Sequence, residues 1–272
     1  MSNVYFTDTH CHIHEENYAD SEAAYQRAME AGVKRLICVG TDVKSSREAV
    51  GFARDHDNVW ASVGLHPHDA TSGLHAIEEL EELIRVSSLQ SPASKIVAIG
   101  ECGLDYFYNN SPREEQIAVL EAQLQLAQDY GLPVIFHVRD GKTPEHGSVW
   151  TDFWPILDAY KGLRGVLHSF TDTMSNLEKG LARGLLVGVN GISTFTRDEN
   201  QRQMFASIPV GSLLLETDAP FLTPVPHRGT VNEPAFTTHI AHHIANLQSI
   251  SLEELSRATE RNATNIFFNT NT

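Results

Sequence analysis

Short apolar runs recur at fairly even intervals along the chain, and no other feature limits the choice of fold as strongly. Eight such runs are present, and most of them are rich in Val, Ile and Leu. They span residues 4–10, 33–40, 59–65, 95–101, 132–138, 165–170, 185–190 and 212–218. Runs of this length and composition are typical of strands that are covered on both faces in a parallel sheet.

Helical patterns lie between most of these runs. The segment SEAAYQRAMEAG ends at Gly32, which we expect to cap the C-terminus of a helix. Ser111 and Glu114 have the spacing of a capping box and predict a helix start, and Ser251 and Glu254 have the same spacing. Strand and helix therefore alternate, which indicates a parallel α/β architecture.

Eight strand–helix units in a chain of 272 residues match the size of a (β/α)8 TIM barrel. We predict a single barrel domain over residues 1–272, with the active site at the C-terminal ends of the strands. An open doubly wound sheet is the alternative. The sequence contains no G-x-G-x-x-G after its first strand, no Walker A loop and no G-x-S-x-G elbow, so it lacks the usual fingerprints of dinucleotide, nucleotide and serine-hydrolase sites.

Composition narrows the classes of function. No run approaches the roughly 20 apolar residues of a membrane span, and the N-terminus has no signal-peptide pattern. The three cysteines have no C-x-x-C spacing and suit reduced thiols, so we expect a cytoplasmic protein. The net charge of −15 argues against a broad basic patch for nucleic acid. It does not exclude a nuclease, because bound divalent metal can attract phosphate locally.

Several apolar runs end in a residue that can bind metal. In a barrel these strand ends converge on one face, so ligands distant in sequence would meet there. His10 and His12 have the i, i+2 spacing that puts two side chains on one face of a strand. His14 would share this face only if the strand continued, and EENYAD indicates that it does not. The predicted metal ligands are His10, His12, Glu101, His137, His168 and Asp218.

Four histidines and two carboxylates are a mixed nitrogen and oxygen donor set. Zn, Mn, Co, Ni or Fe fits this set better than Ca, and Mg is a further candidate. Six ligands are too many for one catalytic zinc, but they suit two divalent ions that share a bridging carboxylate. Such a pair activates water for hydrolysis, with phosphate esters as leading substrates. One histidine on a strand is, taken alone, more typically a core residue. The prediction therefore depends on the six residues taken together.

Seven motifs, taken in order, resemble the TatD family of metal-dependent deoxyribonucleases, within the amidohydrolase-like barrels: TDTHCHI, GLHPHDA, GECGLDY, VIFHVRD, LHSFTDT, LLLETDAPFLTP and HRGTVNEP. The resemblance runs from about residue 4 to about residue 268. It implies a TIM-type barrel with two metal ions and with Asp218 and Glu101 in catalysis. Asp218 would accept a proton from the attacking water. By matching motifs, one ion takes His10, His12, Glu101 and Asp218, and Glu101 bridges to a second ion that His137 and His168 complete.

The sequence departs from the family pattern in places. Cys102 stands where an aliphatic residue is usual, and Asp172 stands where glycine is usual. We expect the added charge of Asp172 to alter substrate preference. The segment 139–150 is longer than a typical strand–helix loop, and His146 within it is a minor ligand candidate.

Other polar residues have two interpretations. His66, Arg139 and Arg228 are predicted to contact substrate phosphate, although loop hydrogen bonds or salt bridges would also explain them. The remaining polar residues near the motifs are expected to support loops and ligands: Asp8, His68, Asp105, Asn232 and Glu233.

The leading function is a metal-dependent phosphodiesterase that acts on DNA, including as an exonuclease. The alternative is a two-metal hydrolase of an amide, lactone or aminoacyl ester. Barrel amidases often bridge their metals with a carboxylated lysine, so Glu101 favours the phosphoesterase. A non-enzymatic binding protein is disfavoured, because none of the six ligands is missing. We expect DNA or another phosphodiester to bind only in the cleft, since no aromatic-interleaved basic stretch is visible. We expect no membrane association and no obligate protein partner.

Overall fold

The computed structural model describes residues 4–90, 95–108, 110–142 and 147–269. The chain divides into two compact units. The first unit contains Met1–Cys38 and His168–Thr272, and the second unit contains Val39–Leu167. The single domain over residues 1–272 stays a prediction. His146 lies outside the described residues, so its role as a ligand also stays untested.

Each of the eight predicted apolar runs overlaps a strand, and the strands follow one another in sequence order in the sheet. Their bounds are β1 (Phe6–Cys11), β2 (Val33–Val39), β3 (Val59–Val63), β4 (Ile96–Asp105), β5 (Val134–Arg139), β6 (Gly165–Leu167), β7 (Leu186–Val189) and β8 (Leu213–Leu215). Parallel strands that alternate with helices in this order are the predicted (β/α)8 barrel class. The doubly wound alternative is wrong, because its strand order departs from sequence order.

Ten α-helices lie between and after the strands of the described chain: α1 (Ser21–Ala31), α2 (Val43–Asp55), α3 (Gly73–Gln90), α4 (Arg113–Tyr130), α5 (Trp150–Ala159), α6 (Met174–Ala182), α7 (Ile192–Phe195), α8 (Glu199–Ser207), α9 (Thr237–Leu247) and α10 (Leu252–Ala263). Four short helical turns also lie within the described residues: η1 (Pro67–Ser72), η3 (Val210–Ser212), η4 (Pro234–Phe236) and η5 (Thr264–Phe268). None of the described helices is both long enough and apolar enough to cross a bilayer.

Two of the three predicted helix caps are confirmed. Gly32 follows α1 with a φ of 91°, a left-handed conformation that glycine adopts without strain. The Ser251 side chain accepts a hydrogen bond from the N–H of Glu254 at the start of α10 (3.1 Å). The predicted capping box at Ser111 is wrong, because α4 begins two residues later without a side-chain cap. The buried Ser111 hydroxyl instead donates to the carbonyl of His68 (2.8 Å).

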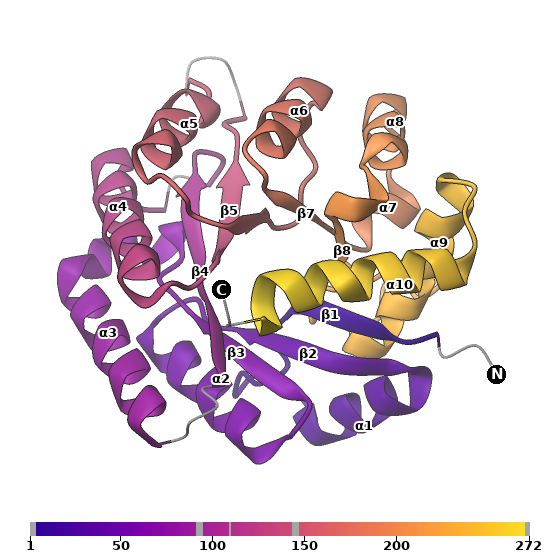
Figure 1. Cartoon of the computed structure of the whole chain (residues 1–272), viewed down its shortest axis with the longest axis horizontal. Coiled ribbons are helices and arrows are strands. Elements are labelled where there is room, and N and C mark those ends of the chain that lie inside the picture. Colours follow the sequence, from indigo (N-terminus) through magenta and orange to yellow (C-terminus); the bar gives the residue numbers. More distant parts are fainter. Residues whose placement is uncertain (1–3, 91–94, 109, 143–146, 270–272) are drawn as a thin grey trace. The chain divides into compact units, whose positions relative to one another are not determined.

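The first unit brings the first and last strands of the chain together. β1 pairs with β2 on one side, and on the other side Cys11 forms a parallel bridge with Ala219, just beyond β8. The Thr9 hydroxyl also donates to the carbonyl of Leu215 (3.1 Å). The helix α10 packs against β1 and β8, with α9 beside it (Figure 1). Because of this arrangement, the C-terminal ends of β1 and β8 are neighbours.

The second unit contains β3, β4, β5 and β6 as adjacent parallel strands. The helix α2 packs on β3, and α4 packs on β4 (Figure 1). Two buried amide side chains of α4 hold the ends of these strands. Gln123 bonds the N–H and carbonyl of Leu65 (2.8 and 3.0 Å), and Gln116 bonds the N–H and carbonyl of Asp105 (2.8 and 3.1 Å). The strand ends therefore have fixed positions even where the ladder of the sheet stops.

Candidate metal centre

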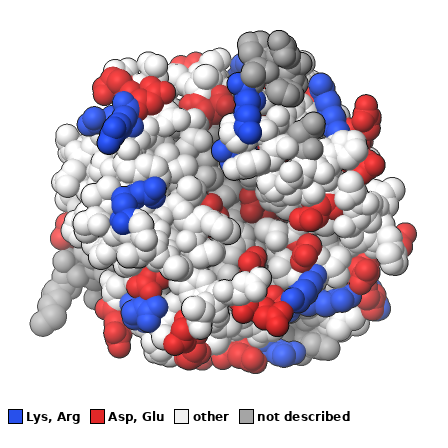
Figure 2. Space-filling model, turned by 180° about the vertical axis from the view of Figure 1, so that it is seen from behind, with Lys and Arg blue, Asp and Glu red and all other residues white. Residues whose placement is uncertain are grey.

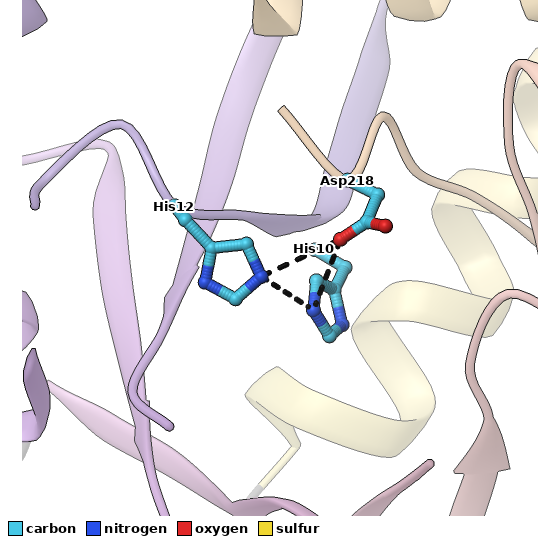
Figure 3. Close-up of side chains that lie close together, drawn as sticks. All are labelled: His10, His12 and Asp218. Atoms are coloured by element: carbon cyan, nitrogen blue, oxygen red, sulfur yellow. Dashed lines mark hydrogen bonds and ion pairs between the residues drawn. The ribbon is translucent and has the colours of Figure 1, made fainter. Parts of the chain in front are cut away.

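Backbone hydrogen bonds between the ends of β1 and β8 build what we call the first cluster, which consists of His10, His12, His168 and Asp218. The N–H of Asp218 donates to the carbonyl of His10 (2.9 Å), and the N–H of His12 donates to the carbonyl of Ala219 (2.7 Å). Figure 3 shows the side chains of His10, His12 and Asp218 turned toward one another. Three predicted ligands from opposite ends of the chain therefore meet.

The polar atoms of these three side chains have the spacing of ligands around one ion. His10 Nε2 lies 3.1 Å from His12 Nε2, and Asp218 Oδ1 lies 3.4 Å from His12 Nε2 and 3.7 Å from His10 Nε2. Two donors that each lie about 2.1 Å from one ion are roughly 3 to 3.5 Å apart. The two imidazoles are buried, but 15% of the Asp218 side chain is exposed, so water reaches the carboxylate.

The Asp218 carboxylate is ionised at neutral pH. Burial alone would raise the pKa of Asp218, but its contact with His12 and the nearby His168 and His10 hold the pKa below its usual value. An ionised carboxylate facing imidazole nitrogens is a donor set that suits a divalent transition ion.

His168 joins the first cluster from the position directly after β6. Its Nε2 lies 3.8 Å from Asp218 Oδ1, and its ring stacks on that of His10 with the centroids 3.4 Å apart. On the opposite edge of the ring, Nδ1 lies 3.0 Å from Oε1 of Glu216. A carboxylate behind an imidazole fixes the orientation of a ligand ring, so Glu216 positions His168.

Glu216 was not predicted from the sequence. It is buried, and its Oε1 also accepts a hydrogen bond from the N–H of Ser169 (2.6 Å). Gly188 on β7 leaves the room that Glu216 needs, because a Cβ there would lie 2.1 Å from Oε2. The signal in the sequence was LLLETD, in which an apolar strand runs into two acids, each of which needs a partner when it is buried.

Asp8 supports the junction of β1 and β8 through the backbone. Its Oδ1 accepts from the N–H groups of His10 (3.2 Å) and Thr217 (2.9 Å), and its Oδ2 accepts from the Thr217 hydroxyl (2.5 Å). Burial raises the pKa of Asp8 to about 7, although the bonds from Thr217 oppose this shift. The geometry agrees with the supporting role expected for Asp8.

The loop after β8 is anchored by the two residues expected to do so. The buried Asn232 amide donates to the carbonyls of Thr217 (2.8 Å) and Phe221 (2.5 Å). Glu233 forms an ion pair with Arg27 on α1 (2.5 Å). The Asn232 amide therefore holds the turn that carries Asp218, and the Glu233–Arg27 ion pair ties the end of this loop to α1.

What we call the second cluster lies at the ends of β4 and β5 and consists of His66, Glu101 and His137. His137 Nδ1 is 2.8 Å from Glu101 Oε1, and the same oxygen is 3.6 Å from His66 Nε2. The two strands come close here because residue 103 is glycine. A Cβ at Gly103 would lie 1.8 Å from the carbonyl oxygen of His137, so any other residue would push the strands apart.

Asp105, at the end of β4, organises the second cluster from behind. Its Oδ2 lies 2.9 Å from His137 Nε2 and 3.1 Å from His68 Nε2, and its Oδ1 accepts from the N–H groups of Phe107 (2.8 Å) and Tyr108 (2.9 Å). Burial alone would raise the pKa of Asp105, but the hydrogen bond from His137 lowers it well below its usual value. Asp105 therefore organises the loop, as expected, and also orients His137.

His137 lies between two carboxylates. Burial would lower the pKa of His137, but hydrogen bonds to Asp105 and Glu101 raise it to about 9. A metal ligand must be a neutral imidazole, so a cation that binds here displaces a proton.

His66 is held in a tautomer that makes it a hydrogen-bond donor. Its Nδ1 accepts from the N–H of His68 (3.2 Å), which leaves the ring proton on Nε2, the atom that faces Glu101. Burial, together with the neighbouring His137, lowers the pKa of His66 to about 4, so the ring is neutral at pH 7. A protonated Nε2 cannot ligate metal, and His66 therefore suits a donor role better than a ligand role.

Within the first unit, four of the predicted ligands form the first cluster, and within the second unit Glu101 and His137 belong to the second cluster. Each group combines imidazole nitrogen and carboxylate oxygen, so the residues fit divalent ions of the predicted kinds. That Glu101 bridges two ions, with His168 on the ion of His137, stays a prediction.

The two arginines predicted to bind phosphate both stack on aromatic rings. Arg139 lies over Phe107 (4.1 Å to the ring centroid), and Arg228 lies over Phe195 (3.7 Å) and donates to the carbonyl of Thr223 (2.6 Å). Within the residues that the structure describes, neither arginine forms an ion pair with a carboxylate. The salt-bridge alternative is thus unsupported there, and phosphate binding stays a prediction.

The charged side chains on the rest of the surface agree with the net negative charge of the chain. Figure 2 shows acidic side chains spread over one face, with basic side chains in a few separate groups between them. Asp172, the departure from the family pattern, accepts from the N–H of Thr173 (2.6 Å) and from the Asn176 amide (2.7 Å) at the start of α6. Its negative charge is favourable at a helix N-terminus.

Comparison with known proteins shows what the chain is similar to. The family model described as TatD related DNase matches residues 7–268. The chain is 37% identical over 254 residues to the 3′-5′ ssDNA/RNA exonuclease TatD of Erwinia amylovora, covering 91% of this chain and 93% of that protein. It is 33% identical over 261 residues to the uncharacterized metal-dependent hydrolase YabD of Bacillus subtilis, covering 96% and 98%.

A solved structure agrees with these relatives. The crystal structure of YjjV, a TatD homolog from Escherichia coli, has a TM-score of 0.85 and 30% identity, and it covers 97% of this chain and 98% of that one. The fold class and the resemblance predicted from the motifs are both confirmed. The chain belongs to the family of TatD-related DNases.

Proposed function

We propose that the chain is a metal-dependent nuclease that hydrolyses phosphodiester bonds in single-stranded DNA or RNA from the 3′ end. The observation that carries the proposal is the convergence of His10, His12 and Asp218 at ligand spacing. The family match supports the class of reaction, and the name of the Erwinia relative supports the substrate and the polarity.

We assign divalent cations to both clusters, with His10, His12, His168 and Asp218 as ligands in the first and with Glu101 and His137 in the second. Bound there, such ions supply the Lewis acidity that activates water and offsets the negative charge of the phosphate. The donor atoms suit Zn, Mn, Co or Ni, and Mg is a further candidate.

Asp218 is the residue that we assign as proton acceptor. Its carboxylate is held ionised, and part of it is exposed to water. Oδ1 faces the imidazoles, so Oδ2 is the atom that takes a proton from the attacking water. Glu101, which is buried and hydrogen-bonded to His137, keeps its position through that bond.

The substrate phosphate is bound by donors of two kinds. His66 offers a neutral N–H at Nε2, which can bond a phosphate oxygen without adding charge. Arg139 and Arg228 offer guanidinium groups, whose paired N–H donors match two oxygens of one phosphate. We assign all three to substrate binding.

The test uses short single-stranded oligonucleotides that carry a label at either end, and full-length protein loaded with Mn²⁺, Zn²⁺, Co²⁺, Ni²⁺ or Mg²⁺ in turn. A 3′ label should be released at once as mononucleotide, whereas a 5′-labelled strand should shorten step by step. A chelator should abolish both signals, and added metal should restore them.

Two variants and a substrate panel complete the test. His12→Ala should lose cleavage, whereas His75→Ala, at a histidine on α3 whose side chain is 79% exposed, should cleave normally. Failure to cleave any strand with any of these metals, combined with chelator-sensitive hydrolysis of an amide, lactone or aminoacyl ester, would replace the proposal with its alternative.

A further inference from the structure

Four side chains beside the second cluster form what we call the aromatic–cation platform: Phe107, Tyr108, Arg139 and Lys142. The aromatic pair directly follows β4, and the two cations come from the end of β5 and the turn after it. These strands are paired neighbours within the second unit (Figure 1). Aromatic and basic residues thus come together from two segments, although neither segment contains alternating aromatic and basic residues.

Both cations lie against the aromatic rings. The Arg139 guanidinium is 4.1 Å from the centroid of Phe107 and 4.9 Å from that of Tyr108. The Lys142 ammonium is 4.3 Å and 5.7 Å from the same two centroids. Tyr108 is 50% exposed, and both basic side chains are exposed as well. The platform therefore offers a ring face and two positive charges to solvent.

The charges of the platform have no internal counter-ion in the described structure. No carboxylate of residues 4–90, 95–108, 110–142 or 147–269 forms an ion pair with Arg139 or Lys142. Arg113 is a useful contrast, because it also stacks on a ring, that of Tyr106, but pairs with Asp152. In a chain with a net charge of −15, two cations that lie on aromatic rings and lack a counter-ion among the described residues indicate a negatively charged ligand.

The neighbouring acid does not change this conclusion. Asp140 follows Arg139 directly, but its carboxylate accepts hydrogen bonds from the N–H groups of Gly141 (3.0 Å) and Val149 (2.9 Å) and from the Ser148 hydroxyl (3.0 Å). It shapes the turn after β5 and leaves the charge of Arg139 available.

One carboxylate joins the platform to the second cluster. Asp105 Oδ1 accepts from the N–H groups of Phe107 and Tyr108, while its Oδ2 bonds His137. The N–H of Tyr106 also donates to the carbonyl of Arg139 (3.0 Å). The aromatic pair is therefore fixed two to three residues beyond Asp105, with the strand end that carries Arg139 beside it, next to Glu101 and His137 of the second cluster.

We propose that the platform binds the single strand of a nucleic acid substrate next to the metal centre, with a base on the Tyr108 ring and with phosphates at Arg139 and Lys142. This inference rests on the proposed function, and it adds the site that selects an unpaired strand. Aromatic faces stack on any base, and cations beside them track the backbone, so binding is tolerant of sequence. A base that is still paired within a duplex cannot reach the ring.

The experiment measures binding separately from cleavage. Full-length, Mn²⁺-loaded protein is titrated into a short fluorescein-labelled oligonucleotide whose phosphorothioate linkages resist hydrolysis, and anisotropy gives Kd at several salt concentrations. The proteins are wild type, Tyr108→Ala, Tyr108→Phe, Arg139→Ala, Lys142→Ala and a matched control, Arg54→Ala. Arg54 is 71% exposed at the end of α2, near the start of β3.

Each substitution has its own expected signature. Tyr108→Ala should raise Kd roughly tenfold, because a stacked base contributes on this scale, and Tyr108→Phe should restore tight binding. Arg139→Ala and Lys142→Ala should each reduce the salt dependence of log Kd by about 0.7, the value for one phosphate contact on a single strand. Arg54→Ala should match wild type. An oligonucleotide with abasic sites should bind wild type and Tyr108→Ala equally.

Two results would each overturn the proposal that the platform binds nucleic acid. One is an equal Kd of wild type and Tyr108→Ala for the intact strand, and the other is an unchanged salt dependence of log Kd in both cation variants. Absence of any binding by wild type would do so too. The chemistry is judged separately, with wild type and a small chromogenic phosphodiester that needs no platform. Platform-dependent binding, without hydrolysis of the chromogenic phosphodiester or of an unmodified oligonucleotide, would support the platform and refute the proposed function.

Discussion

The two clusters hold their histidines in different ways. In the first cluster the imidazole nitrogens lie 3.1–3.8 Å from one another or from Asp218, and main-chain bonds between the ends of β1 and β8 set the places of His10, His12 and Asp218. In the second cluster His137 lies between Glu101 and Asp105 at 2.8 and 2.9 Å. Main-chain pairing therefore positions most of the first cluster, whereas side-chain hydrogen bonds position the second cluster.

The largest effect should come from removing a ligand of the first cluster. We expect His12→Ala to lower kcat/KM for single-stranded DNA at least about a thousandfold, since loss of an outer partner of a ligand alone costs roughly 10- to 100-fold. Metal content, measured by elemental analysis, should fall in parallel. A variant with full metal content and full activity would mean that this group is not a metal site.

The second-largest effect should come from changing Asp105, the side chain that supports the second cluster. Asp105→Asn should weaken metal affinity by up to roughly 100-fold, because an amide cannot accept from two imidazoles and two N–H groups as the carboxylate does. Competition with a chromogenic chelator measures this. Asp129→Asn, at an exposed position on α4, is the matched control. If the two variants bind metal equally well, Asp105 serves the loop only.

A third substitution tests whether His66 donates a hydrogen bond to the substrate or binds metal. His66→Ala should keep its metal but lose about tenfold in kcat/KM, the scale of one hydrogen bond to a charged group. His66→Gln, which can still donate, should recover part of this loss. Loss of metal from His66→Ala would make His66 a ligand and would contradict the placement of its ring proton on Nε2.

The smallest effect should come from the carboxylate behind the first cluster. Glu216→Gln should weaken metal affinity by less than about tenfold. The amide oxygen can still accept from Ser169, and stacking on His10 continues to hold His168. If this variant loses more affinity than Asp105→Asn, the contrast between backbone and side-chain support is wrong.

The strand pattern and the candidate ligand residues at the strand ends could be predicted from the sequence, whereas the exact ends of the helices and strands could not. All eight runs overlap strands, but β4 extends to Asp105, beyond the predicted end at residue 101. The buried Gln116 amide holds that extension from α4. Ser111 has a capping-box pattern, yet its hydroxyl bonds the distant carbonyl of His68. Contacts between distant segments decided both cases, and local spacing carries no signal for them.

The sequence also does not indicate which side chains on different strands contact one another. It contains no stretch in which aromatic and basic residues interleave, yet Tyr108 and Arg139 stack because β4 and β5 are paired. Likewise, Asp105 and Glu216 could be recognised as buried acids, but not as partners of particular imidazoles.

The alternation of strand and helix and the chemical type of each strand-end side chain could be predicted without coordinates, because apolar periodicity and residue identity are local properties. Tertiary packing set which nitrogen faces which carboxylate, which histidine is a donor and which cations lack a counter-ion among the described residues. These depend on the distances between segments far apart in the chain, and only the packing of strands and helices sets those distances.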